Sequence, residues 1–173
     1  MKGIAMRRNL STAASAALVS LVAAALIADE PMPAPNGADA AVRDVLLRNA
    51  RGFESGDLPM LDGLWAHDAD VTVFESGHAN YGWEDYRDNH LKPEIGEMKN
   101  VRYRLTDVKT HVDGKTAWAT FKYTISANVG ERRVEGGGLG TAVLENRGTG
   151  WKIVHWHASA PRRPPGGPTQ TLP

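Results

Sequence analysis

The chain contains no cysteine among its 173 residues, and it has no excess of charge of either sign. The missing thiols exclude disulfides, thiolate-bound metals and a cysteine nucleophile. Lysine and arginine number 20, aspartate and glutamate also number 20, and aromatic residues make up only 7%. Binding to a nucleic-acid backbone needs a basic excess, so we expect no nucleic-acid partner. With 42% hydrophobic and 23% charged residues, the composition is that of a globular protein of one domain.

Acidic residues are absent before Asp29, and Lys2, Arg7 and Arg8 precede an alanine-rich apolar run. A basic start, an apolar centre and a small final residue form the layout of a secretory signal peptide, and the two adjacent arginines also resemble a twin-arginine export signal. The apolar run has about 16 residues, fewer than the roughly 20 of a spanning helix, although an uncleaved anchor is the alternative. We expect residues 1–28 to be a cleaved signal peptide, the protein to be periplasmic or secreted, and its mature form to have no stable membrane insertion.

Prolines are scarce between the two ends of the chain. Three of the ten lie in a linker at 29–38, and five lie in a tail at 161–173, which leaves only Pro59 and Pro93 in between. Because proline-rich stretches cannot form helices or central strands, they mark the borders of a folded region. We therefore place one domain at 39–160 and expect the tail to be disordered.

Within this domain the hydrophobic spacing changes from helical to strand-like. Helices are predicted at 39–55, from the capping residue Asp57, and after Gly82, with Pro93 ending or kinking the third, and a short strand is predicted at 71–74. A period of two then predicts strands over 101–108, 116–125, 132–145 and 151–159. The glycine run at 136–140 lies inside a strand pattern, so it predicts a bend or bulge and not a phosphate loop. Three helices followed by a four-stranded antiparallel meander predict an α+β fold.

The domain resembles the SnoaL-like branch of the nuclear transport factor 2 superfamily in several short motifs. These are Glu54-Ser55-Gly56-Asp57, Val73-Phe74-Glu75, Gly82-Trp83-x-x-Tyr86 and Trp151-Lys-Ile-Val-His-Trp-His-Ala-Ser159. The last motif is similar to the final strand of the association (hub) domain of calcium/calmodulin-dependent protein kinase II. The resemblance implies a cone-shaped fold in which three N-terminal helices pack on a curved antiparallel β-sheet around a pocket, usually in a dimer or larger assembly. It also implies a choice among isomerase, cyclase, dehydratase and binding members, because this fold does not select one activity.

The hub domain resembles this chain less in its pocket. The arginines of the hub pocket correspond to Lys122, Ala142 and Ala158 in this sequence. Only one of the three is basic, so a carboxylate-binding pocket of the hub type is not expected, and neither is the ring assembly of the hub.

Three residues are predicted to be catalytic: Glu75, Tyr86 and His90. Glu75 follows the short strand, where a carboxylate in a pocket can act as a general base, similar to the carboxylate bases of the isomerase members. Helical spacing puts Trp83, Tyr86 and His90 on one face, and a histidine can act as acid or base near neutral pH. The alternative is an amphipathic helix that buries both aromatic residues and leaves His90 at its boundary.

Residues of the strands complete the predicted site. Trp118 and Lys122 share a strand face that either lines the pocket or contacts solvent. His155 and His157 lie two positions apart and therefore share a face, with Trp156 on the other. The histidine pair either supports the structure, lines the pocket, or holds a metal with a third ligand from Glu75, His78 or His90. The residues predicted to bind a ligand are Trp83, Trp118, Lys122, His155, Trp156 and His157.

Four functions remain open from the sequence. We favour an exported homodimeric domain that binds a small organic molecule in a central pocket, with no cofactor and no resident metal. The first alternative is a cyclase- or isomerase-type enzyme with Glu75 or His90 as base and Tyr86 or Lys122 as carbonyl partner. The others are metal binding through the histidine pair and oligomerisation through the outer face of the sheet. No phosphate loop, nucleophile elbow or zinc-binding helix motif occurs in the sequence.

Overall fold

The computed structural model describes residues 37–161. The predicted signal peptide at 1–28, nearly all of the linker at 29–38 and the tail beyond Pro161 lie outside the described residues, so these three stay predictions. Among the residues that the structure describes, no helix is long and apolar enough to cross a membrane.

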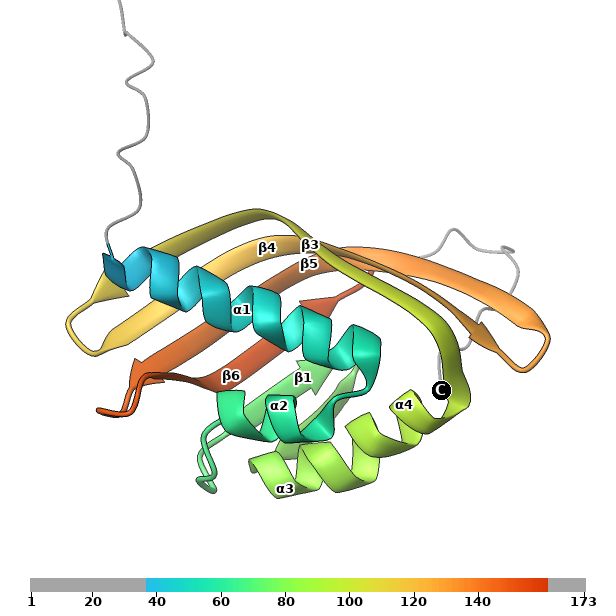
Figure 1. Cartoon of the computed structure of the whole chain (residues 1–173), viewed down its shortest axis with the longest axis horizontal. Helices are drawn as coiled ribbons and strands as arrows, with labels where there is room; N and C mark the ends of the chain where they lie inside the picture. Colours follow the sequence, from blue (N-terminus) through green and yellow to red (C-terminus); the bar gives the residue numbers. More distant parts are fainter. Residues whose placement is uncertain (1–36, 162–173) are drawn as a thin grey trace, which may run out of the picture. The chain divides into compact units, whose positions relative to one another are not determined.

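Two helices, α1 (Gly37–Ser55) and α2 (Leu58–Leu64), begin the described chain, and α1 runs across the concave face of the sheet (Figure 1). As the spacing predicts, α1 buries one stripe of side chains: Val42, Val45, Leu46, Asn49 and Ala50. Gly56 has a φ of +69°, a left-handed conformation in which α1 ends. The carboxylate of Asp57 accepts a hydrogen bond of 3.0 Å from the backbone nitrogen of Met60, which confirms the predicted helix cap.

The sheet has six strands and is mixed. The strands are β1 (Thr72–Glu75), β2 (His78–Tyr81), β3 (Met98–Asp113), β4 (Thr116–Val129), β5 (Arg132–Asn146) and β6 (Trp151–Ser159). Their order is β2-β1-β6-β5-β4-β3, with β1 parallel to β6 and all other neighbours antiparallel. The predicted antiparallel meander corresponds to β3–β6, whereas β1 extends it by parallel pairing.

Strand β2 has no counterpart in the prediction, since its sequence is short and polar. Its signal lies in the Ser76-Gly77 pair, because both residues have positive φ (51° and 86°), as in a two-residue hairpin turn. This turn folds β2 back on β1.

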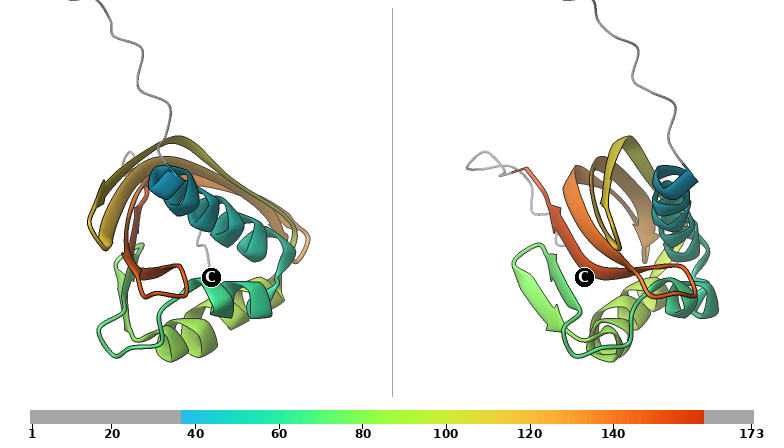
Figure 2. Two further views of the ribbon diagram at one scale, coloured as in Figure 1. Left: turned by 60° about the vertical axis from the view of Figure 1, so that its left-hand side comes forward. Right: turned by 90° about the vertical axis from the view of Figure 1, so that its left-hand side faces the viewer.

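Bulges curve β3 around α1. The pairing of β3 with β4 shifts register at two places, between Lys99 and Arg102 and between Thr106 and Lys109. Asn100 and Asp107 lie at these shifts with φ of 53° and 51°, a left-handed conformation that asparagine and aspartate adopt more readily than other residues with a Cβ. Bulged strands bend, and Figure 2 shows the sheet wrapping the helix. Helices packed on a curved sheet confirm the predicted α+β fold class.

The third predicted helix has a wide turn in its middle. It consists of α3 (Trp83–Tyr86), a π-helical turn η1 (Arg87–Leu91) and α4 (Lys92–Glu97), which follow one another without a break. Of the two predicted outcomes at Pro93, an end or a kink, the end is wrong, because the helix continues to Glu97. The nitrogen of Pro93 carries no hydrogen for the carbonyl four residues earlier, and the wider turn that precedes it accommodates this loss.

Close packing, and not a bulge, explains Gly140 in the glycine run of β5. The register between β4 and β5 is uninterrupted from Val129–Arg132 to Thr116–Glu145, so of the bend or bulge predicted at 136–140 the bulge is wrong. A Cβ on Gly140 would lie 2.1 Å from a ring carbon of Phe121. The Phe121 ring in turn packs against Trp156, with centroids 4.7 Å apart, so Gly140 makes room for the inner aromatic layer.

We predict that Gly140→Ala lowers the free energy of unfolding by about 2 kcal/mol, because overpacking a tight site forces neighbouring rings to shift. Gly136→Ala is the matched control, since its Cβ would meet only the Ile125 side chain, at 3.4 Å. Denaturant unfolding of both variants measures the difference. Equal stability of the two variants would contradict this account of the glycine run.

Candidate functional site

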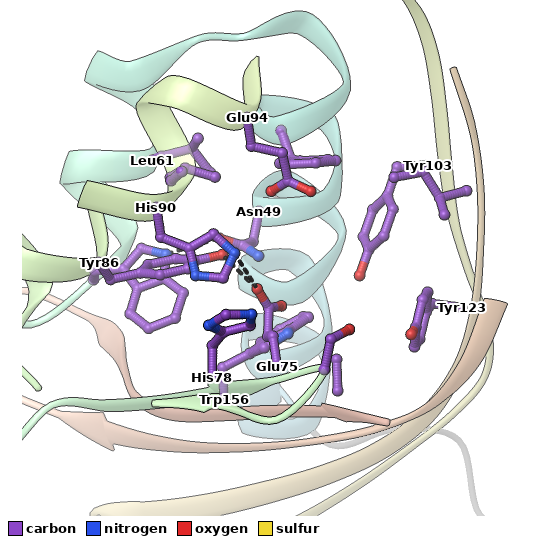
Figure 3. A pocket seen from close by; sticks show the side chains of 16 residues that line it. Asn49, Leu61, Glu75, His78, Tyr86, His90, Glu94, Tyr103, Tyr123 and Trp156 are labelled. Atoms are coloured by element: carbon purple, nitrogen blue, oxygen red, sulfur yellow. Dashed lines mark hydrogen bonds and ion pairs between the residues drawn. The ribbon is translucent and has the colours of Figure 1, made fainter. Parts of the chain in front are cut away.

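A pocket of about 110 Å³ lies between α1, the helical segment 83–97 and the concave face of the sheet. Figure 3 shows its side chains converging from these elements. No lysine or arginine is found among the described residues that line it. Six aromatic residues, two glutamates, two histidines and one asparagine are part of the lining: Phe53, Trp65, Tyr86, Tyr103, Tyr123, Trp156, Glu75, Glu94, His78, His90 and Asn49. A more open hollow of about 300 Å³ shares His78, His90 and Glu94 with it.

Glu75 points into this pocket from the end of β1. Strand alternation explains the direction, since Val73 is buried on the inner side while Phe74, between them, is exposed. The hydroxyl of Tyr86 donates a hydrogen bond of 3.3 Å to Oε2 of Glu75. Burial raises the pKa of the Glu75 carboxyl to about 7, although hydrogen bonds from Tyr86 and Trp156 act in the opposite direction. The carboxyl therefore changes charge near neutral pH.

His90 lies in the π-helical turn and contacts Glu75. Its Nε2 is 3.8 Å from Oε2 of Glu75, and its Nδ1 is 3.0 Å from Oδ1 of Asn80. Burial and the neighbouring His78 lower the pKa of His90, whereas Asp85 raises it. The structure thus brings together the three residues predicted to be catalytic, Glu75, Tyr86 and His90, around one carboxyl group (Figure 3).

Glu94 is a second carboxyl group of the pocket that our sequence reasoning missed. Burial, followed by the charge of Glu75, raises its pKa to about 8. Two carboxyls that affect one another titrate as a pair. The missed signal was helical spacing, since Tyr86, His90 and Glu94 succeed one another at intervals of four residues.

Tyr103 and Tyr123 form the wall opposite His90, and Glu75 lies between this wall and the histidine (Figure 3). Their rings, from β3 and β4, have centroids 5.9 Å apart. Burial raises the pKa of both hydroxyls, that of Tyr103 well above its ordinary value, so both phenols stay neutral donors. Sequence reasoning did not place these two tyrosines in the site, because only the pairing of two distant strands brings them to the pocket.

Asn49 offers an amide group from α1. Its Oδ1 accepts a hydrogen bond of 2.9 Å from the indole of Trp65, deep in the core. This bond leaves the NH₂ end of the amide as the part that can donate to a ligand, since Asn49 also lines the pocket.

Three residues predicted to bind a ligand lie outside the pocket. Trp83 is completely buried, stacks on Trp65 with centroids 5.2 Å apart, and is therefore a core residue. Trp118 and Lys122 lie on the outer face of β4, because the inner face carries alanines and Phe121. Lys122 forms an exposed ion pair of 2.7 Å with Asp107.

The histidines of β6 also face outward, whereas Trp156 lines the pocket. His155 and His157 share a face as predicted, and the Phe74 ring packs edge-on against both. Nδ1 of His155 is 2.7 Å from the hydroxyl of Thr72. His155 and His157 therefore lie on the opposite face of the sheet from Glu75. This arrangement contradicts a metal site that the two histidines share with Glu75. Among residues 37–161, no group of three or more histidines, aspartates or glutamates has a geometry for holding a metal.

Comparison with known proteins agrees with this architecture. A sequence-family model described as the SnoaL-like domain matches residues 42–163. No curated protein sequence matches the chain.

Three solved structures are similar in fold. A nuclear transport factor 2-like superfamily protein from Salmonella enterica serovar Typhimurium LT2 has a TM-score of 0.66 at 20% identity, covering 75% of this chain and 94% of its own. A candidate ketosteroid isomerase from Shewanella frigidimarina NCIMB 400 has a TM-score of 0.62 at 21% identity, covering 71% of this chain and 98% of its own. A candidate dehydratase of the same superfamily from Streptomyces avermitilis has a TM-score of 0.65 at 23% identity, covering 72% of this chain and 96% of its own.

We predict that Glu75→Gln removes much of the loss of stability that the protein undergoes as pH rises. The folded state holds the Glu75 proton up to about pH 7 and the unfolded state only up to about 4.5, so stability is full below 4.5 and declines through 7. This difference corresponds to about 3 kcal/mol. Denaturant unfolding at pH 4.5 and pH 8 measures it.

Glu131→Gln, at an exposed turn residue, is the matched control and is expected to retain the decline of the wild type. A decline that is equally steep in Glu75→Gln would show that the Glu75 carboxyl is not held in its neutral form by the fold.

Proposed function

The chain belongs to the SnoaL-like domain family, and we propose that it binds a small uncharged organic molecule in the pocket and moves a proton of that molecule. Because the fold hosts many activities, the proposal rests on the pocket itself. The observation that carries it is the Glu75 carboxyl, which loses its proton near pH 7 inside an aromatic cavity and faces neutral hydroxyl donors. A base with a pKa close to the working pH is the most effective.

The proposed reaction takes place at a carbon next to a carbonyl group. The Glu75 carboxylate removes a proton from this carbon, and the electron pair of the C–H bond moves toward the carbonyl oxygen. A hydroxyl of Tyr103 or Tyr123 donates to the oxygen as its negative charge develops. Return of the proton from Glu75 to another carbon of the ligand would complete an isomerisation, with no net change in protons.

The lining of the pocket determines which ligands are compatible with it. Among the described residues, no lysine or arginine lines it, so it offers no cationic partner to a carboxylate or phosphate ligand. The aromatic side chains favour apolar rings. A volume of about 110 Å³ suits a molecule of roughly one ring. These features support a small cyclic ketone or a similar neutral compound, and they do not require a cofactor.

We predict that the protein accelerates exchange of the α-protons of cyclohexanone in D₂O, and that Glu75→Gln slows this exchange by about 100-fold. The rate should rise with pH through about 7, as the Glu75 carboxyl becomes ionised. Proton nuclear magnetic resonance (NMR) measures exchange without knowledge of the natural substrate.

Glu94→Gln is the matched variant from the same pocket and should retain most of the rate. Equal losses in both variants would contradict the assignment of the base to Glu75. If cyclohexanone binds to the wild type but its α-protons do not exchange, the proposed proton transfer is contradicted. The domain is then a module that binds a small organic molecule, the function that the sequence favours.

We also propose that the domain acts outside the cytoplasm as a homodimer. The signal layout of residues 1–28 supports export. The outer face of the sheet carries several exposed large hydrophobic side chains, a feature typical of protein interfaces: Phe74, Tyr81, Trp118 and Leu139.

For the homodimer, we predict a mass in solution that stays twice that of the chain on dilution, and dissociation of the dimer in Leu139→Glu. Leu139 is 60% exposed in the single chain, so a glutamate there should not disturb the fold of the monomer. Light scattering over a dilution series measures the mass. A wild-type protein that is monomeric throughout would contradict this part of the proposal.

A further inference from the structure

Asp85 is the centre of a hydrogen-bond network next to the pocket. Its carboxylate accepts from the Asn89 amide at 2.8 Å, from the Asn80 amide at 2.9 Å and from the backbone nitrogen of Tyr81 at 3.2 Å. These donors lower the pKa of Asp85, so it is a carboxylate at neutral pH and acts only as an acceptor.

This acceptor fixes the orientation of the Asn80 side chain. The NH₂ end of the Asn80 amide must face Asp85, and its oxygen therefore faces Nδ1 of His90, 3.0 Å away. An amide oxygen can only accept a hydrogen bond, so Nδ1 of His90 must carry a hydrogen. In a neutral histidine the other nitrogen, Nε2, then has a free electron pair.

We propose that Asp85 and Asn80 are positioning residues that hold His90 in its Nδ1–H form, so that Nε2 accepts the proton that Glu75 takes from the ligand. Nε2 is 3.8 Å from Oε2 of Glu75, a separation that has to shorten when a ligand fills the pocket. In this step the O–H bond of Glu75 breaks and an Nε2–H bond forms, which gives a carboxylate and an imidazolium. The imidazolium then gives its proton back to Glu75 for return to the ligand, or to water in the exchange reaction, so both groups regain their starting charge. The inference rests on the proposed function, because it assigns His90 a role in the same proton transfer.

The surroundings of His90 are compatible with this role. The titratable groups around its ring are Glu75, Glu94, His78, Tyr86 and Asp85. Of these groups, only Glu75 lies within 4 Å of Nε2 as an ion-pair partner among the described residues. The π-helical turn at Arg87–Leu91 places His90 at this position, and such turns are frequent at functional sites.

Nitrogen-15 NMR of histidine-labelled, ligand-free protein at pH 8 tests the proposal, with His90→Gln to assign the signals. In the wild type we expect Nδ1 of His90 to be protonated and Nε2 to be bare. In Asn80→Ala the partner of Nδ1 is lost, and the Glu75 carboxylate should draw the proton to Nε2. Asn89→Ala, which removes a contact to Asp85 but none to His90, should retain the wild-type form.

A proton on Nε2 in the wild type, or an unchanged Nδ1–H form in Asn80→Ala, would overturn the proposal. Amide spectra of each variant show whether it is folded, so that a tautomer change is not taken from an unfolded chain.

The cyclohexanone exchange assay separates this proposal from the proposed function. Asn80→Ala should slow exchange at least about tenfold when Glu75 is present, and should add no loss in the Glu75→Gln background. Equal losses in both backgrounds would show a merely structural role for Asn80. If Glu75→Gln exchanges cyclohexanone protons as fast as the wild type while NMR finds His90 in its Nδ1–H form, the proton transfer from Glu75 to His90 is wrong. The hydrogen bond by which Asn80 orients His90 is then the part of the proposal that is retained.

Discussion

A mostly buried carboxyl group with a histidine nearby, and no lysine or arginine among the described residues around it, is the constraint on which the candidate site depends. Glu75 reaches the pocket because β1 pairs in parallel with β6, which places it opposite Ala158 and next to Trp156 on the inner face. Within residues 37–161 no lysine or arginine lines the cavity, and hydrogen bonds from the neutral Tyr86 and Trp156 favour the charged form of Glu75. Ionisation of this residue is therefore sensitive to whatever fills the pocket, as expected of a group that handles protons.

The aromatic layer around Glu75 depends on residues that have no polar role. Gly140 leaves room for Phe121, and Phe121 packs against Trp156 in the wall of the pocket. Trp65 similarly connects the pocket to the core, since it stacks on Trp83 and donates to Asn49. The polar groups of the site are thus held by packed rings that cannot move independently.

Local patterns were sufficient to predict the helices and part of the site. The stripe of α1, the Asp57 cap and the final strand were all predicted correctly, because each depends on residues close together in the sequence. Glu75 and Tyr86 were predicted because they belong to short motifs, and His90 because helical spacing puts it on the same face as Tyr86.

Features that depend on pairing of distant strands could not be predicted in the same way. Tyr103 and Tyr123 reach the pocket only through the curvature of β3 and β4, and that curvature depends on bulges that no hydrophobic period reveals. For Lys122, alternation defined two faces of a strand but not which face was inside. The outward direction of His155 likewise became clear only once Trp156 was placed in the pocket.

The bulges at Asn100 and Asp107 also affect the outer border of the sheet. Strand β3 is its last strand, and an unpaired border strand is a template on which another chain can add by hydrogen bonding. A regular strand of this length would offer a long straight row of free backbone groups. Two bends in β3 divide that row into short stretches that point in different directions, so the irregularity that shapes the pocket also protects the domain from aggregation.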